Sequence, residues 1–211
     1  MQKPFRITTE LLVTKCPYFA ALQRPEVITT SNYPPPSRLS GPFFFPDLDE
    51  FAFALFTRWI YDGQLHGPRD FHTTNHYVAL YVLASKFRIE VLKNTVMDLL
   101  RGYYHRENMT APAFRLDYIY ANTDGPNPMR EFLVTTAAYR AMAEKPEGIS
   151  ESIKGVLRGG GEAAVDFVLA LVTLHNNERV DVRKGDECRW HEHEVTVKCK
   201  AWGGFQPWEH A

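Results

Sequence analysis

Four side chains that bind transition metals lie close together near the carboxyl end of the 211-residue chain. Cys188, His191, His193 and Cys199 have the spacing Cys-x2-His-x-His-x5-Cys, which places two thiols and two imidazoles within 12 residues. Tetrahedral zinc accepts this ligand set. On a straight strand Cys188 and His191 would point to opposite faces, so the segment must bend to bring them together. No acid or base stands out beside the set, which therefore predicts a structural zinc site rather than a catalytic one.

The same segment also permits a simpler interpretation. Residues 178–200 carry six acidic and six basic side chains, so their charges cancel. A segment of mixed charge is commonly a solvated surface. The alternative hypothesis is a polar tail in which the two cysteines and two histidines bind no metal. No cofactor other than a structural zinc ion is expected.

The chain lacks the motifs of the common enzyme classes. It contains no GxSxG, GxGxxG, GxxxxGK[ST] or HExxH sequence. The glycines at residues 159–161 precede Glu162, whose negative charge opposes phosphate binding at that helix start. Cys16 lies in an apolar segment without a neighbouring histidine, so it is predicted to be a small buried side chain. We therefore expect a non-enzymatic protein with no catalytic residues.

Composition and charge exclude several classes of partner. The chain has 24 basic and 25 acidic side chains, so it has no overall positive field to attract nucleic acid. It contains no apolar run long enough for a signal peptide or a membrane span. Three cysteines are too few for a disulfide framework. These features predict a cytoplasmic or nuclear protein that contacts neither nucleic acid nor membrane.

The spacing of apolar residues divides the chain into short strands and longer helices. Strands are predicted at residues 5–7, 43–45 and 195–197. Asp47 and Glu50 resemble a capping box at the start of a helix. Helices are predicted at about residues 16–22, 51–62, 75–87, 90–103, 112–122, 128–143, 151–157 and 162–175. A little β-structure followed by a run of helices predicts an α+β fold.

The order of several short motifs resembles the BTB/POZ domain, in particular the large fungal group of that family. The resemblance is carried by Phe5-Arg6-Ile7, by Leu11-Leu12 and by Cys16-x-Tyr18-Phe19. It continues through Asp47-Leu48-Asp49-Glu50-Phe51, Leu55-Phe56, Trp59-Ile60-Tyr61, Gly63 and Leu65, and then through residues 80–98. The helical extension of the fungal group has its counterpart in Tyr118-Ile119-Tyr120-Ala121-Asn122-Thr123 and Pro128-Met129-Arg130.

The resemblance implies a BTB/POZ-like small sheet with a helical cluster in residues 1–105. An all-helical extension would occupy residues 106–176, and an irregular polar tail with the Cys/His cluster would occupy residues 177–211. Only four residues precede Phe5, so the family's first strand is expected to be missing and the usual exchanged homodimer to be weak or absent.

The family works through protein–protein interaction, so the resemblance predicts homo- or hetero-association, with another BTB chain or a cullin as the partner. Two alternatives remain open at this stage. One is a substrate adaptor of a cullin-based ubiquitin ligase, and the other is a regulator of transcription or chromatin.

Overall fold

The computed structural model describes residues 5–22, 43, 45–143, 149–177, 180–185 and 188–199. Their regular structure consists of α-helices and one short 3-10 helix, and these residues contain no strand. The chain forms two compact units, Met1–Lys93 and Asn94–Ala211. We call them the N-terminal and the C-terminal unit and describe each by itself.

The predicted α+β fold with a small sheet is wrong for the described residues. The strand signal at residues 5–7 leads instead into helix α1 (Thr9–Lys15), which includes Leu11 and Leu12. Phe43 and Phe45 adopt no strand, and Phe44 lies outside the described residues. Residues 195–197 form a bend and coil. A short apolar run is equally compatible with a strand or a buried turn, and only a partner strand decides for the sheet.

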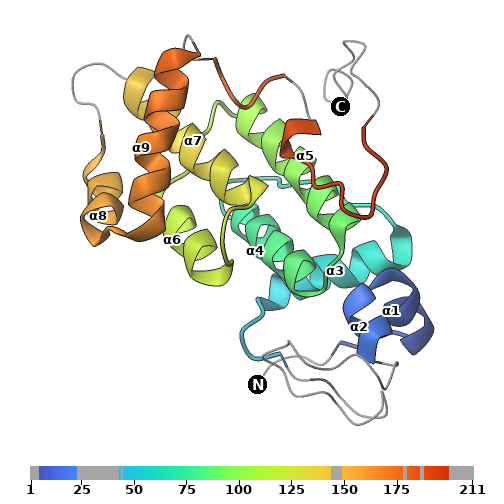
Figure 1. Cartoon of the computed structure of the whole chain (residues 1–211). Helices are drawn as coiled ribbons and strands as arrows, with labels where there is room; N and C mark the ends of the chain where they lie inside the picture. Colours follow the sequence, from blue (N-terminus) through green and yellow to red (C-terminus); the bar gives the residue numbers. More distant parts are fainter. Residues whose placement is uncertain are drawn as a thin grey trace. The chain divides into compact units, whose positions relative to one another are not determined.

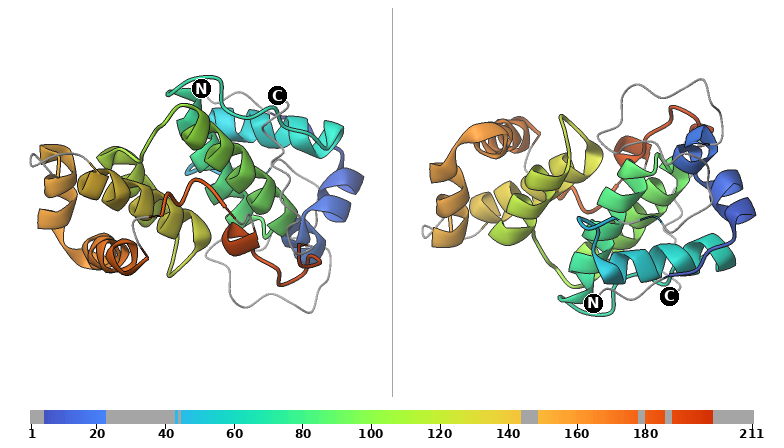
Figure 2. Two further views of the ribbon diagram at one scale, coloured as in Figure 1. Left: turned by 90° about the horizontal axis from the view of Figure 1, so that it is seen from above. Right: turned by 90° about the horizontal axis from the view of Figure 1, so that it is seen from below.

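The N-terminal unit is organised around an aromatic cluster. It contains α2 (Pro17–Leu22), α3 (Glu50–Asp62) and α4 (Thr73–Lys86), with α1 beside α2 and α3 (Figures 1 and 2). Phe87, directly after α4, is buried at the centre of the cluster. Its ring centroid lies 5.1 Å from that of Phe19, 5.3 Å from that of Phe45 and 5.5 Å from that of Phe56, all in edge-to-face arrangements. Such tilted contacts between rings are the favoured geometry.

Local signals explain both ends of α3. The Asp49 side chain accepts a hydrogen bond of 2.7 Å from the backbone N–H of Ala52, so Asp49 rather than the predicted Asp47 is the N-cap. The helix ends at Gly63, whose φ of 73° is the left-handed conformation that glycine adopts without strain. The predicted helix is therefore confirmed, and its cap was misplaced by two residues.

The C-terminal unit is built around helix α7. Its helices are the greater part of α5 (Glu90–Arg106), then α6 (Ala113–Asn122), α7 (Pro128–Ala143), α8 (Glu151–Gly159) and α9 (Gly161–Asn176), followed by the 3-10 helix η1 (Cys188–Trp190). α9 lies along α7, and α6 contacts α7, α8 and α9 (Figure 1). The predicted helices from residue 90 onward are confirmed. For α7, both ends lie at the predicted residues.

Arg130 joins three helices of this unit. It is almost completely buried. Its Nε donates to Thr123 Oγ1 over 2.8 Å, and its Nη2 donates to the backbone carbonyls of Tyr120 and Thr123 at the end of α6. Its Nη1 contacts the Glu162 carboxylate, at the start of α9, over 2.5 Å. The motif residues at the end of α6 and the start of α7 thus form one charged capping network.

Candidate functional site

The segment that holds the four candidate metal ligands is docked onto the helices of the C-terminal unit. Trp190 in η1 is buried, with its ring centroid 5.5 Å from that of Phe132 on α7. Upstream, Arg183 is also buried and donates to the backbone carbonyl of Met109 over 3.0 Å. Arg189 pairs with Glu131 on α7 at 2.8 Å. The described parts of the segment are therefore anchored, which argues against a wholly solvated tail.

Three of the four predicted ligands converge on one point. Cys188 Sγ lies 3.4 Å from His193 Nε2, and Cys199 Sγ lies 3.6 Å from the same nitrogen. The three ligand atoms all lie within 4.8 Å of one another. The 3-10 helix η1 begins at Cys188, so the chain turns there instead of continuing as a straight strand.

The fourth predicted ligand, His191, borders the same group. Its Nδ1 lies 3.1 Å from Cys199 Sγ. Its other ring nitrogen, Nε2, lies 2.8 Å from Oδ1 of Asp98 on α5. The side chain of His191 is largely buried, so its orientation is set by these two neighbours. The structure thus gathers Cys188, His193 and Cys199 at one point, and His191 borders this group through its contact with Cys199.

Two further residues of the site were missed by sequence reasoning. Asp98 and His191 are 93 positions apart, and no local pattern connects them. Asn94, one turn earlier on α5, donates to the backbone carbonyl of Glu192 over 2.8 Å and accepts from its N–H over 3.0 Å. The residue between the two histidines is therefore held by a pair of hydrogen bonds from α5. The available signal in the sequence was the four-residue spacing of Asn94 and Asp98, which places both polar side chains on one side of α5.

The Cys188 thiol opposes the ionisation of the Cys199 thiol. The pKa of Cys199 is raised to about 11, first by desolvation, then by the hydrogen bond and charge of Cys188, and further by the charge of Asp98. A thiol with such a pKa carries a proton at neutral pH. A bound divalent cation reverses this preference, because it stabilises both thiolates directly.

The third cysteine belongs to the core of the N-terminal unit. Cys16 is completely buried, and burial raises its pKa to about 12. The prediction of a small buried side chain is confirmed. A reactive thiol needs a lowered pKa and access to solvent, and Cys16 has neither.

A second surface feature lies on α9. Val165, Val168, Leu169 and Val172 are each between 52% and 59% exposed. Their spacing places them on one side of the helix, whereas Phe167, Ala170 and Leu174 are buried in the packed core. A helix that is apolar on both sides is normally covered on both sides. We call Val165, Val168, Leu169 and Val172 the α9 face.

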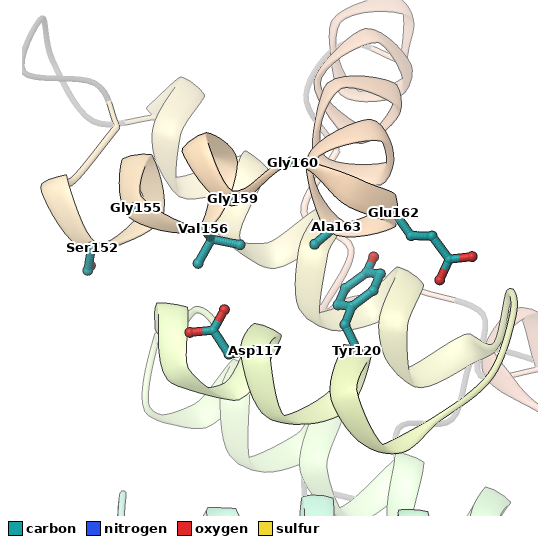
Figure 3. Close-up of a pocket in the computed structure, with 9 residues that line it drawn as sticks. All are labelled: Asp117, Tyr120, Ser152, Gly155, Val156, Gly159, Gly160, Glu162 and Ala163. Carbon is teal, nitrogen blue, oxygen red and sulfur yellow. The ribbon is translucent and has the colours of Figure 1, made fainter.

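A cleft of about 530 Å³ lies between α6, α8 and α9 (Figure 3). Asp117 and Tyr120 enter it from α6, and Glu162 lies at the start of α9. The Tyr120 hydroxyl donates to Asp166 over 2.6 Å; burial, then this hydrogen bond, raises the pKa of Tyr120. Glu162 is paired with Arg130. The described residues that line the cleft include no cysteine or histidine.

Comparisons with protein-family models, with curated proteins and with solved structures find no match to this chain. The BTB/POZ resemblance therefore stays a prediction, and the sheet that it implied is absent from the described residues. Among those residues, no helix has both the length and the apolar character needed to cross a bilayer.

Proposed function

We propose that the chain is a non-enzymatic protein-interaction module that binds an amphipathic helix of a partner protein through the α9 face. The observation that carries this proposal is the exposure of four aliphatic side chains, each more than half accessible, on one side of a helix whose other side is buried. Exposed aliphatic side chains gathered in one contiguous patch are typical of an interaction surface.

The shape of the face favours a helical partner. Val165, Val168, Leu169 and Val172 occupy positions i, i+3, i+4 and i+7, the pattern by which two helices interdigitate. Over these positions the face is about 10 Å long, which matches two turns of a partner helix. The exposed carboxylates of Asp117 and Glu162 lie near the start of α9, so we expect basic residues beside the apolar stripe of that partner.

The resemblance of residues 47–65 and 80–98 to helices of the BTB/POZ domain also supports a function in association. Proteins of that family act by binding other proteins. The cullin-adaptor and chromatin-regulator alternatives remain predictions, since no feature of the described residues favours either of them.

A photo-crosslinking amino acid at position 169 tests the proposal in the full-length chain. We expect crosslinked peptides that map to an apolar helix of one partner, and loss of this product when Val168 and Val172 are both changed to Glu. Val91→Glu is the matched control, because Val91 is an equally exposed valine (54%) on helix α5. The control should retain the crosslink.

Two results would contradict the proposal. One is a crosslink that survives in the Val168→Glu, Val172→Glu variant, provided that circular dichroism shows the variant to be folded. The other is a crosslink only between two copies of the chain, accompanied by a dimer in light scattering, which would make a second copy the occupant.

A further inference from the structure

We propose that Cys188, His191, His193 and Cys199 bind one structural zinc ion, and that Asp98 orients one of its ligands and so fastens the carboxyl-terminal segment to α5. This inference is independent of the α9 face. It rests on the positions of the ligand atoms and on what holds each imidazole ring.

Three distances between ligand atoms suit a tetrahedral ion. With Zn–S bonds of about 2.3 Å and Zn–N bonds of about 2.0–2.1 Å, a sulfur and a nitrogen on one zinc ion lie about 3.5 Å apart. Three of the four sulfur–nitrogen pairs lie near this distance: 3.4 Å for Cys188 and His193, 3.6 Å for Cys199 and His193, and 3.1 Å for Cys199 and His191. Cys188, His193 and Cys199 already form one group, and His191 would have to move toward it to complete the tetrahedron.

Each histidine offers one nitrogen to the cluster and is held through the other. His193 faces the thiols through Nε2, while its Nδ1 lies 3.1 Å from Thr196 Oγ1. His191 faces Cys199 through Nδ1, while its Nε2 lies 2.8 Å from Asp98. Metal-binding histidines commonly have this arrangement, in which a carboxylate or another polar group fixes the ring and its tautomer. The sequence pattern alone could not assign the ligating nitrogens.

The attachment to α5 explains why such a site would matter to the fold. Asn94 and Asp98 lie one helical turn apart and hold Glu192 and His191, respectively. A zinc ion on His191 would therefore connect Cys188, His193 and Cys199 to α5 through one imidazole. Four protein ligands leave no open coordination position, so the site is structural rather than catalytic.

The first experiment measures metal content and ligand type on the full-length chain expressed with zinc and kept reduced. We expect one zinc ion per chain by native mass spectrometry, and an X-ray absorption spectrum with two sulfur and two nitrogen ligands. Cys188→Ser and Cys199→Ser should each lose the metal. His66→Ala should keep it, because His66 is an exposed histidine in a loop. The X-ray absorption spectrum of the unaltered chain tests the ligand set even if the cysteine variants fail to fold.

The second experiment tests the role of Asp98 as a positioning residue. Asp98→Asn should still bind one zinc ion at saturation, but with an affinity 10- to 100-fold lower in competition with a chelator. Glu131→Gln is the matched control, because Glu131 also pairs with the segment, through Arg189, but contacts no candidate ligand. The control should leave the affinity unchanged.

Three outcomes would overturn the inference. The first is a reduced chain that carries no metal after expression with zinc. The second is zinc coordinated by ligands other than two sulfur and two nitrogen atoms. The third is an equal loss of zinc affinity in Asp98→Asn and Glu131→Gln, which would show that Asp98 does not position a zinc ligand.

Discussion

The two units of the molecule bury different kinds of side chain. The N-terminal unit surrounds Phe87 with aromatic rings, and its buried polar side chains among the described residues are Thr74 and Glu90. In the C-terminal unit, the described residues include four buried arginines: Arg101, Arg115, Arg130 and Arg183. One unit depends mainly on apolar packing, whereas the other also depends on charged groups that must find hydrogen-bond partners inside the protein.

This difference predicts different tolerance to substitution. Apolar burial is non-directional, so an apolar cluster accepts another apolar residue of similar size at modest cost. A buried guanidinium presents five donors in a fixed planar fork, which a lysine does not reproduce. A conservative change should therefore be cheap in the N-terminal unit and costly in the C-terminal unit.

The largest effect is expected for Phe87→Ala. Loss of the central ring would leave a cavity between Phe19, Phe45 and Phe56 and lower the free energy of unfolding by about 4 kcal/mol. Phe87→Leu should lower it by only about 1 kcal/mol. Urea denaturation followed by circular dichroism measures both. Equal losses of unfolding free energy in the two variants would show that the geometry of the ring contacts, rather than apolar volume, stabilises this unit.

Arg130→Lys should have the next largest effect, about 2–3 kcal/mol, although it preserves the charge. Lysine cannot satisfy the Thr123 side chain, the carbonyls of Tyr120 and Thr123, and the Glu162 carboxylate at once. The control is Arg158→Lys, on the exposed surface of α8, with no measurable loss expected. If Arg130→Lys costs less than Phe87→Leu in the same assay, the proposed contrast between the units is wrong.

The pH dependence of stability gives a smaller effect per pH unit, and this effect begins at a different pH in each unit of the molecule. Burial raises the pKa of Cys16 from 9.0 to about 12, so above pH 9 the unfolded chain loses this proton before the folded chain does. Stability that is fully present below pH 9 should therefore fall by about 1.4 kcal/mol per pH unit until pH 12. Cys16→Ala should remove this slope. An unchanged slope would mean that the thiol is accessible in the folded protein.

Tyr104 supplies the corresponding test in the C-terminal unit. Burial, opposed by its contact with Arg115, raises the pKa of this tyrosine from 10.0 to about 12. The loss of stability from this group should therefore begin near pH 10 rather than pH 9. Tyr104→Phe lowers the overall stability because it removes the acceptor for Arg115, yet it should flatten the curve above pH 10. A matching titration by ultraviolet absorbance identifies the tyrosine.

Helix caps give the smallest contrast. Asp49→Ala should cost about 1 kcal/mol, because its carboxylate accepts from Ala52 over 2.7 Å. Ser150→Ala at the start of α8 should cost only about 0.5 kcal/mol, because its bond to the N–H of Ile153 is 3.4 Å long. Thermal unfolding of the two variants side by side provides the comparison. A larger loss for Ser150→Ala would reverse the expected order.

Helices were predictable because their signals are local. The apolar spacing in α3, α4 and α7 repeats every three to four residues, and Gly63 ends α3 through a backbone conformation of its own. The predicted strands at residues 5–7 and 195–197 failed because a strand exists only when another strand pairs with it. Thr9–Lys15 was missed because its short apolar run carries no clear period.

The sequence by itself determined which residues are available: two thiols and two imidazoles at a spacing that suits zinc, and an α9 helix that is apolar on both sides. The tertiary structure alone decided that Trp190 is buried, that Arg130 closes the end of α6, and that Asp98 meets His191 across 93 positions. The physical reason is the range of the interactions. Helical periodicity and capping act between near neighbours, whereas burial and charge pairing depend on which distant segments the folded chain brings together.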